Sequence, residues 1–329
     1  MLFVDNQNMT DPRMNLAIEE HLLRNLDTDE EILLFYINEP SIIIGRNQNT
    51  LEEINCDYVE AHDLHVVRRL SGGGAVYHDL GNLNFSFITP YEAGSFQNFA
   101  KFTAPVIRVL HDLGVDAELS GRNDVLVNGR KISGNAQYRT ATRMFSHGTL
   151  LFDTTLEDVV AALNVSQEKI SSKGLKSVRS RVANISEFLD EPMTTLEFRQ
   201  HLLEGIFAGS EGIPQYALTE EDWESIRMIK GRRYDRWEWN YGKSPRFNVQ
   251  KSHRFPSGKI DVRIDIQRGL IEEIKIYGDF LGDGDVEEIE VRLRGTRYAR
   301  EALAAALAGL ELAPYFGGVT QEEFVDLLY

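Results

Sequence analysis

The chain has 329 residues, of which 42% are hydrophobic and 26% are charged, as in an ordinary soluble globular protein. Its net charge of -16 argues against a nucleic-acid binder, because such proteins depend on Lys and Arg contacts to phosphates. The sequence contains no apolar run long enough to span a membrane, no signal-peptide pattern and only one cysteine, Cys56. We therefore expect a cytoplasmic protein with one large and one smaller domain.

The first half of the chain mixes helices and strands in an irregular order. Thr10-Asp11-Pro12 precedes an apolar periodic stretch and predicts a capped helix. Strands are predicted at 31–37, 41–45, 65–69, 82–89 and 144–152, and further helices at 96–110 and 155–163. Apolar and polar residues alternate over 82–89, which predicts a half-buried strand. Asn128-Gly129 indicates a hairpin, because this dipeptide supplies the two positive φ angles of a type I′ turn.

The second half changes character after residue 194. Helices are predicted at 195–208 and 219–230, then strands near 247–255, 259–267 and 270–277, then helices near 285–293, 298–309 and 320–328. Because strands and helices do not alternate strictly, we expect an α+β fold with a mixed, largely antiparallel sheet. We place a large domain at residues 1–245 and a small α/β domain at residues 246–329.

The segment Arg68-Arg69-Leu70-Ser71-Gly72-Gly73-Gly74 is the most informative in the chain. Three glycines leave room for a ligand and allow several backbone N–H groups to face one anion. The arginines can bind a carboxylate or phosphate. The segment is neither a Walker A loop nor a Rossmann turn. We interpret it as an anion-binding loop, with a flexible turn as the alternative.

Lys131 follows the predicted turn, and Asp124 lies seven residues earlier across the hairpin. Spacing alone is also consistent with a solvated surface lysine. Alternatively, Asp124 could pair with Lys131 or hold a divalent metal near a phosphate. Residues 125–152 and 169–186 contain no Asp or Glu but several basic residues, which suggests a local site for an anion.

Other chemistries have little support. His78 and His147 lack neighbouring ligands at zinc-site spacing, and the chain has no Gly-x-Ser-x-Gly motif of a serine hydrolase. Cys56 has no adjacent His or Lys that would lower the pKa of its thiol.

Taken together, these segments resemble the lipoate–protein ligase A family. The matching segments occur in the same order as in that family: 45–49, 68–79, 81–87, 121–125, 131–136, 147–151 and 173–184. The resemblance implies a biotin/lipoate ligase-like catalytic domain followed by a C-terminal accessory domain. It also implies a two-step reaction in which ATP and Mg2+ convert lipoate to lipoyl-AMP, and a lysine of an acceptor lipoyl domain then takes the lipoyl group.

The resemblance also assigns roles to individual residues. Lys131 matches the active-site lysine, and the metal is expected at Asp124. The adenylate site is expected at Arg69, Gly74, Ala75, Val76, Tyr77, Asn123, Asp124 and Lys131. Ser71, His78 and Lys131 are expected near lipoate, and Lys173, Gly174, Lys176, Arg179 and Arg181 in a loop that covers the adenylate. The expected partners are 2-oxoacid dehydrogenase E2 subunits and the glycine cleavage H protein, with the enzyme as a monomer and no nucleic-acid or membrane partner.

Two alternatives remain. An octanoyl or lipoyl transferase of the same fold would use a cysteine beside the lysine, and Cys56 lies outside every matching segment. A non-catalytic acyl-carrier binding protein would not need both Lys131 and an adenylate loop. ATP–pyrophosphate exchange that depends on lipoate distinguishes the ligase from both.

Overall fold

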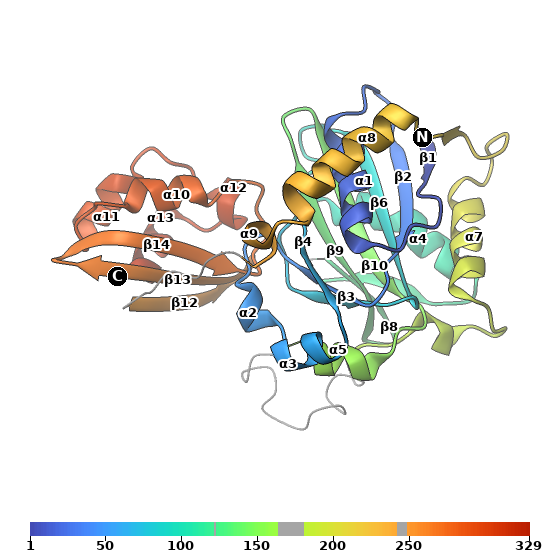
Figure 1. The fold of residues 1–329 in the computed structure, drawn as a ribbon, viewed down its shortest axis with the longest axis horizontal. Helices are drawn as coiled ribbons and strands as arrows, with labels where there is room; N and C mark the ends of the chain where they lie inside the picture. Colours follow the sequence, from blue (N-terminus) through green and yellow to red (C-terminus); the bar gives the residue numbers. More distant parts are fainter. Residues whose placement is uncertain (122, 164–180, 242–248) are drawn as a thin grey trace. The chain divides into compact units, whose positions relative to one another are not determined.

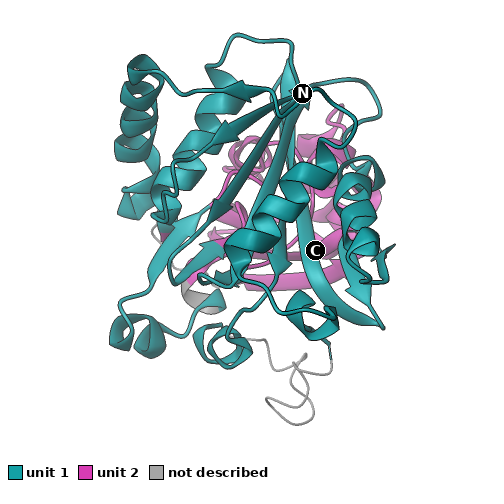
Figure 2. Cartoon of the chain, turned by 90° about the vertical axis from the view of Figure 1, so that its right-hand side faces the viewer, with its two compact units in different colours: residues 1–43, 51–68, 76–240 teal, residues 44–50, 69–75, 241–329 magenta. Residues whose placement is uncertain are grey.

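The computed structural model describes residues 1–121, 123–163, 181–241 and 249–329. The chain divides into two compact units (Figure 2). The first comprises residues 1–43, 51–68 and 76–240, and the second comprises residues 44–50, 69–75 and 241–329. The second unit thus includes two short segments from the first quarter of the chain. The domain boundary predicted between residues 245 and 246 lies outside the described residues.

An eight-stranded mixed sheet forms the centre of the first unit, in the order β11-β1-β2-β6-β10-β9-β8-β7. Its strand β1 is parallel to both of its neighbours, and all other neighbouring pairs are antiparallel. This agrees with the mixed, largely antiparallel sheet that was predicted. The strands are β1 (Leu2–Asp5), β2 (Ile32–Ile37), β6 (Asn82–Pro90), β7 (Ala117–Ser120), β8 (Asp124–Val127), β9 (Arg130–Arg139), β10 (Arg143–Leu151) and β11 (Gln215–Tyr216).

Helices cover both faces of this sheet. On one face α4 (Phe99–Asp112) packs against α7 (Thr195–Ile206), and their apolar side chains join Leu83, Phe85 and Phe87 of β6 in one core. Helix α1 (Pro12–Arg24) contacts β2, β6 and β10 and lies beside α8 (Glu220–Ile229) (Figure 1). Strand β6 is therefore buried on both faces. The prediction of a half-buried strand was wrong, because the polar residues of β6 lie under α1.

A smaller sheet has the order β4-β3-β5, with β3 (Ser41–Ile44) between β4 (His65–Arg68) and β5 (Val76–His78). Residues 69–75, which carry the three glycines, join the two outer strands. Around this sheet lie the short helices α2 (Thr50–Glu53), α3 (Cys56–Ala61) and α5 (Leu156–Ala162), and α5 contacts both α3 and β5.

In the second unit, β12 (Val249–Phe255), β13 (Gly258–Gln267) and β14 (Leu270–Gly278) form an antiparallel sheet. Helices α10 (Glu287–Leu293), α11 (Arg300–Leu307), α12 (Ala313–Phe316) and α13 (Gln321–Leu328) follow, and their apolar residues join those of the strands in a second core. All but the one-turn helix α12 were predicted. Across the described ranges, no helix is long and apolar enough to cross a bilayer.

Candidate active site

Lys131 lies on a tight hairpin between β8 and β9. Asn128 and Gly129 have φ angles of 51° and 75°, so the turn has the two positive φ angles that the sequence predicted. The ammonium Nζ of Lys131 lies 2.8 Å from Oδ1 of Asp124. Both side chains are a little over one-third exposed, so the pair is open to solvent and to a ligand. The structure thus brings together the lysine and the carboxylate.

The backbone of Lys131 forms two hydrogen bonds with residues 181–183. Its N–H donates to the carbonyl of Arg181 at 2.7 Å, and its carbonyl accepts from the N–H of Ala183 at 3.0 Å. Arg181 is exposed. Lys173, Gly174, Lys176 and Arg179, the other residues expected in a covering loop, lie outside the described residues. Residues 181–183 therefore stabilise the start of β9.

Gly134 leaves the space that the Lys131 side chain occupies. A Cβ built on Gly134 would lie 2.9 Å from Nζ and 3.0 Å from Cε of Lys131. Asn123, next to Asp124, is tied to Asn135, whose N–H donates to its carbonyl at 2.9 Å. Local packing therefore fixes the direction of the lysine.

The glycine segment, residues 69–75, crosses closely over the chain at Ile44–Arg46. The N–H of Arg69 donates to the carbonyl of Ile44, and the N–H of Arg46 donates to the carbonyl of Ser71, both at 2.9 Å. A Cβ on Gly45 would lie only 1.9 Å from the carbonyl oxygen of Gly73, which itself has a φ of 91°. In the same unit, the N–H of Gly278 donates to the carbonyl of Asn47 at 2.6 Å. Gly45 is thus required by close backbone packing, and Gly73 is favoured by its positive φ angle.

The Arg69 side chain supports this segment from within. Its Nε donates to Oγ of Ser71 at 3.0 Å, and its Nη2 donates to the carbonyls of Gly72 and Gly74 at 2.7 and 2.8 Å. Arg69 is 6% exposed and Ser71 is fully buried. In this conformation the guanidinium shapes the loop, whereas the sequence had suggested a direct contact with an anion.

Two further expected residues lie on β5. The Tyr77 hydroxyl lies 3.5 Å from Oδ2 of Asp158, and burial together with that carboxylate raises the pKa of Tyr77 well above its ordinary value. Nδ1 of His78 lies 2.9 Å from Nδ2 of Asn38. Both residues are buried, so only limited parts of them can face a ligand.

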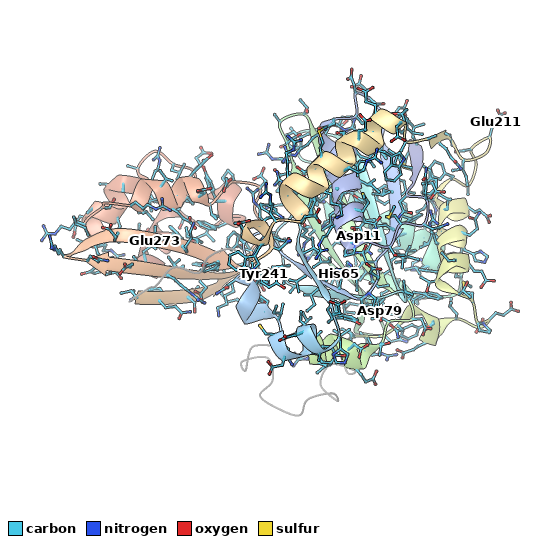
Figure 3. The ribbon with its side chains drawn as sticks, in the orientation of Figure 1. Asp11, His65, Asp79, Glu211, Tyr241 and Glu273 are labelled. Carbon is cyan, nitrogen blue, oxygen red and sulfur yellow. The ribbon has the colours of Figure 1, made fainter. Side chains whose placement is uncertain are left out.

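Asp79, labelled in Figure 3, follows directly after β5. Its carboxylate accepts hydrogen bonds from the N–H groups of Gly81 and Thr155, both at 2.9 Å. Burial raises the pKa of Asp79, and these two hydrogen bonds offset part of that rise. Asp79 therefore anchors the exit of β5 to the start of α5.

A buried contact between a histidine and a carboxylate was not found from the sequence. Nδ1 of His147 on β10 lies 2.9 Å from Oε1 of Glu19 on α1, and both residues are less than 10% exposed. The sequence offered one indication of this contact: Glu19 lies among the apolar residues of α1, most of which are buried. Across the described residues, no three His, Cys, Asp or Glu side chains gather as metal ligands would.

Family models match most of the chain. The lipoyl protein ligase A/B catalytic domain matches residues 11–207, and the bacterial lipoate protein ligase C-terminus matches residues 244–328. Lipoate-protein ligase LplJ of Bacillus subtilis is 61% identical over 331 residues, and lipoate–protein ligase 1 of Staphylococcus aureus is 50% identical over 328 residues. Each alignment covers 100% of both chains.

Solved structures agree with these matches. P. falciparum LipL1 in complex with lipoate has a TM-score of 0.77 at 25% identity, covering 99% of this chain and 97% of its own. A lipoate-protein ligase A bound with ATP has a TM-score of 0.62 at 30% identity, covering 74% and 97%. Together with the full-length relatives, these matches show that the chain belongs to the lipoate–protein ligase family.

Proposed function

We propose that this ligase works in two steps through an acyl adenylate. In the first, a carboxylate oxygen of lipoate attacks the α-phosphorus of ATP, and the bond to pyrophosphate breaks. In the second, the amine of an acceptor lysine attacks the lipoyl carbonyl carbon and loses a proton, and AMP leaves. The observation that carries the proposal is the Lys131–Asp124 pair, 2.8 Å apart on a hairpin whose base is held by residues 181–183.

Lys131 is the catalytic residue of this proposal. Negative charge develops on the α-phosphate oxygens in the first step and on the carbonyl oxygen in the second, and a fixed ammonium stabilises both. Because Asp124 and Gly134 fix the lysine side chain before substrates arrive, little reorganisation is needed. A relative bound with ATP and another in complex with lipoate support these two substrates.

The remaining site residues keep the roles that the resemblance implied. Ser71 and His78 serve the carboxyl end of lipoate, and the covering loop excludes water, which would hydrolyse the mixed anhydride. The adenylate is bound by Gly74, Ala75, Val76, Tyr77, Asn123 and Asp124, in a loop that the Arg69 guanidinium shapes. It is covered by Lys173, Gly174, Lys176, Arg179 and Arg181. Residues 1–245 act as the catalytic domain and residues 246–329 as the accessory domain.

Asp124 is the proposed protein ligand of Mg2+. Magnesium is often bound by one or two carboxylates together with substrate phosphates, so a single exposed carboxylate fits this mode. When bound, the ion would neutralise phosphate charge. Asp124 itself orients the ammonium group of Lys131.

The acceptors are proposed to be lipoyl domains of 2-oxoacid dehydrogenase E2 subunits and of the glycine cleavage H protein. A structure related to this chain is described as an archaeal lipoylation system comprising a bi-partite ligase and its E2 lipoyl domain, which supports this class of partner. The monomeric state and the cytoplasmic location predicted from the sequence remain predictions.

ATP–pyrophosphate exchange that depends on added lipoate tests the proposed function. We expect exchange with lipoate and ATP together, and a background rate when either is left out. Acyl transfer from a carrier protein without ATP would instead favour the transferase alternative. That reaction would require Cys56, which is exposed at the start of α3, so Cys56→Ser should leave a ligase active.

Gly134→Ala is expected to lower kcat for lipoyl-AMP formation about tenfold, or about 1.4 kcal/mol. The added Cβ would lie 2.9 Å from Nζ of Lys131, and the flexible end of the lysine must move away. Because a side-chain tip gives way rather than backbone, the midpoint of thermal unfolding should change little. An unchanged kcat would contradict the claim that the direction of Lys131 matters.

A further inference from the structure

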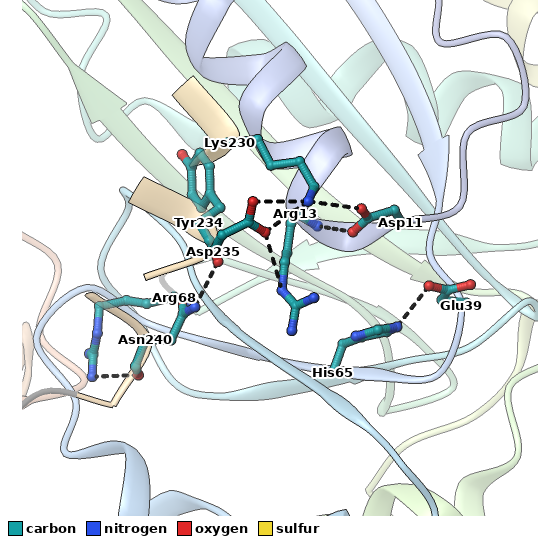
Figure 4. A network of polar contacts seen from close by, with 9 residues as sticks. All are labelled: Asp11, Arg13, Glu39, His65, Arg68, Lys230, Tyr234, Asp235 and Asn240. Atoms are coloured by element: carbon teal, nitrogen blue, oxygen red, sulfur yellow. Dashed lines mark hydrogen bonds and ion pairs between the residues drawn. The ribbon is translucent and has the colours of Figure 1, made fainter. Parts of the chain in front are cut away.

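Arg68 is the last residue of β4 and directly precedes the glycine segment. Although it is a charged residue, it is only 8% exposed. Its Nε donates to the carbonyl of Trp239 at 2.8 Å. Its Nη2 donates to the carbonyl of Asn240 at 3.3 Å (Figure 4). The guanidinium therefore binds the helix α9 (Trp237–Asn240), which lies some 170 residues later in the chain.

The backbone of Arg68 is bound by the same two residues. Its N–H donates to Oδ1 of Asn240 at 3.0 Å, and its carbonyl accepts from the indole N–H of Trp239 at 2.8 Å. A strand end normally leaves such groups to a neighbouring strand or to water. Here two side chains hold both backbone groups of the residue at which the chain leaves β4.

Helix α9 is itself held firmly. Nδ2 of Asn240, a residue 4% exposed, donates to the carbonyl of Tyr234 at 2.7 Å. Tyr234 ends a π-helical turn (Lys230–Tyr234), is fully buried, and donates its hydroxyl to Glu20 on α1 at 3.0 Å. The guanidinium of Arg233 lies 4.7 Å from the centre of the Trp239 ring. Asn240 thus connects the end of β4 to the body of the first unit.

We propose that Asn240 and Trp239 are positioning residues for nucleotide binding. They hold the backbone of Arg68, the residue that leads into residues 69–75, and so restrict the conformations open to the loop that is proposed to bind the adenylate. Neither residue needs to touch a substrate. The inference rests on the proposed function, because it takes that loop as the nucleotide site.

The two functions of the Asn240 amide allow a sharp test. Asn240→Ala removes both the acceptor for the Arg68 N–H and the donor to Tyr234. Asn240→Asp keeps an acceptor facing Arg68 but loses the donor, and it places a carboxylate beside the Tyr234 carbonyl. A purely structural role predicts parallel losses in the two variants. A positioning role predicts that only Asn240→Ala weakens nucleotide binding.

The experiment measures the Kd of ATP by calorimetry, which needs no turnover, together with thermal unfolding of each full-length variant. We expect about a tenfold rise in Kd for Asn240→Ala and no more than about a threefold rise for Asn240→Asp, with both variants less stable than the parent chain. Trp239→Phe, which keeps an aromatic ring but loses the indole N–H and part of the ring beside Arg233, should raise Kd about threefold. Asn98→Ala, which removes the amide cap of α4, is the matched control and should lower stability without changing Kd.

An unchanged Kd in Asn240→Ala, or equal rises in Asn240→Ala and Asn240→Asp, would overturn the proposal. If Asn240→Ala does not fold, Trp239→Phe decides, and parent-like ATP binding in that variant counts against positioning. If the proposed function is wrong, the result is different, because the parent chain itself then shows no lipoate-dependent ATP–pyrophosphate exchange. ATP binding by the parent and its variants can still be compared in that case.

Discussion

Lys131→Ala is expected to lower the rate of lipoate-dependent ATP–pyrophosphate exchange by about 10²–10³-fold, a loss of about 2.7–4 kcal/mol. The ammonium lies 2.8 Å from Asp124 and is directed by Gly134, so its charge sits at a fixed place in a partly open site. Removing it leaves charge that develops on phosphate and carbonyl oxygens without a preorganised partner. Single-turnover formation of lipoyl-AMP measures the same step directly.

Lys101→Ala is a suitable control for this substitution. Lys101 is an exposed lysine on α4 whose ammonium lies 3.8 Å from Glu92. Its removal should leave exchange unchanged, because exposed ion pairs of this kind contribute little. Equal rates of ATP–pyrophosphate exchange in Lys131→Ala and Lys101→Ala would mean that Lys131 has no catalytic role. Lys131 would then be a solvated surface lysine, the alternative that the sequence spacing left open.

Gly45→Ala is expected to reduce the exchange rate about 100-fold and to destabilise the fold by about 1–3 kcal/mol. The new Cβ would lie 1.9 Å from the Gly73 carbonyl oxygen, and a backbone atom cannot rotate away. The glycine segment must shift, and its hydrogen bonds to Ile44 and Arg46 would lengthen or break. Exchange kinetics and chemical unfolding together measure the two effects.

Gly231→Ala provides the comparison for Gly45→Ala. A Cβ on Gly231 would meet no atom within 4 Å, and its φ is not in the left-handed region. This substitution should leave both exchange and stability close to those of the parent chain. Parent-like exchange in Gly45→Ala would mean that the close crossing of the two segments is not needed for catalysis.

Local signals in the sequence predicted much of this structure. Asn128-Gly129 predicted its turn because backbone preference alone decides the conformation of two residues. The cap at Asp11 was equally local, and its carboxylate accepts from the N–H of Arg13. The burial of β6 could not be predicted in this way, because alternation records side-chain polarity and not which helices cover each face.

Long-range polar contacts were beyond the sequence for a different reason. Asn240 and Arg68 are 172 residues apart, and an asparagine carries no periodic or compositional signal for its partner. The direction of the Arg69 guanidinium, toward the carbonyls of its own loop, likewise depends on geometry that residue type does not encode. The ordered motifs predicted which residues form the site, whereas the hydrogen bonds that hold those residues in place required coordinates.

The composition of the second unit has a consequence for synthesis on the ribosome. Residues 44–50 and 69–75 pack with residues near the far end of the chain, since Gly278 donates to Asn47 and a Cβ on Gly72 would meet the Phe280 carbonyl at 2.6 Å. At about 5–20 residues per second, these partners are made about 10–40 s after the glycines. The nascent chain therefore carries residues 44–50 and 69–75 without their packing partners until its last quarter has been made.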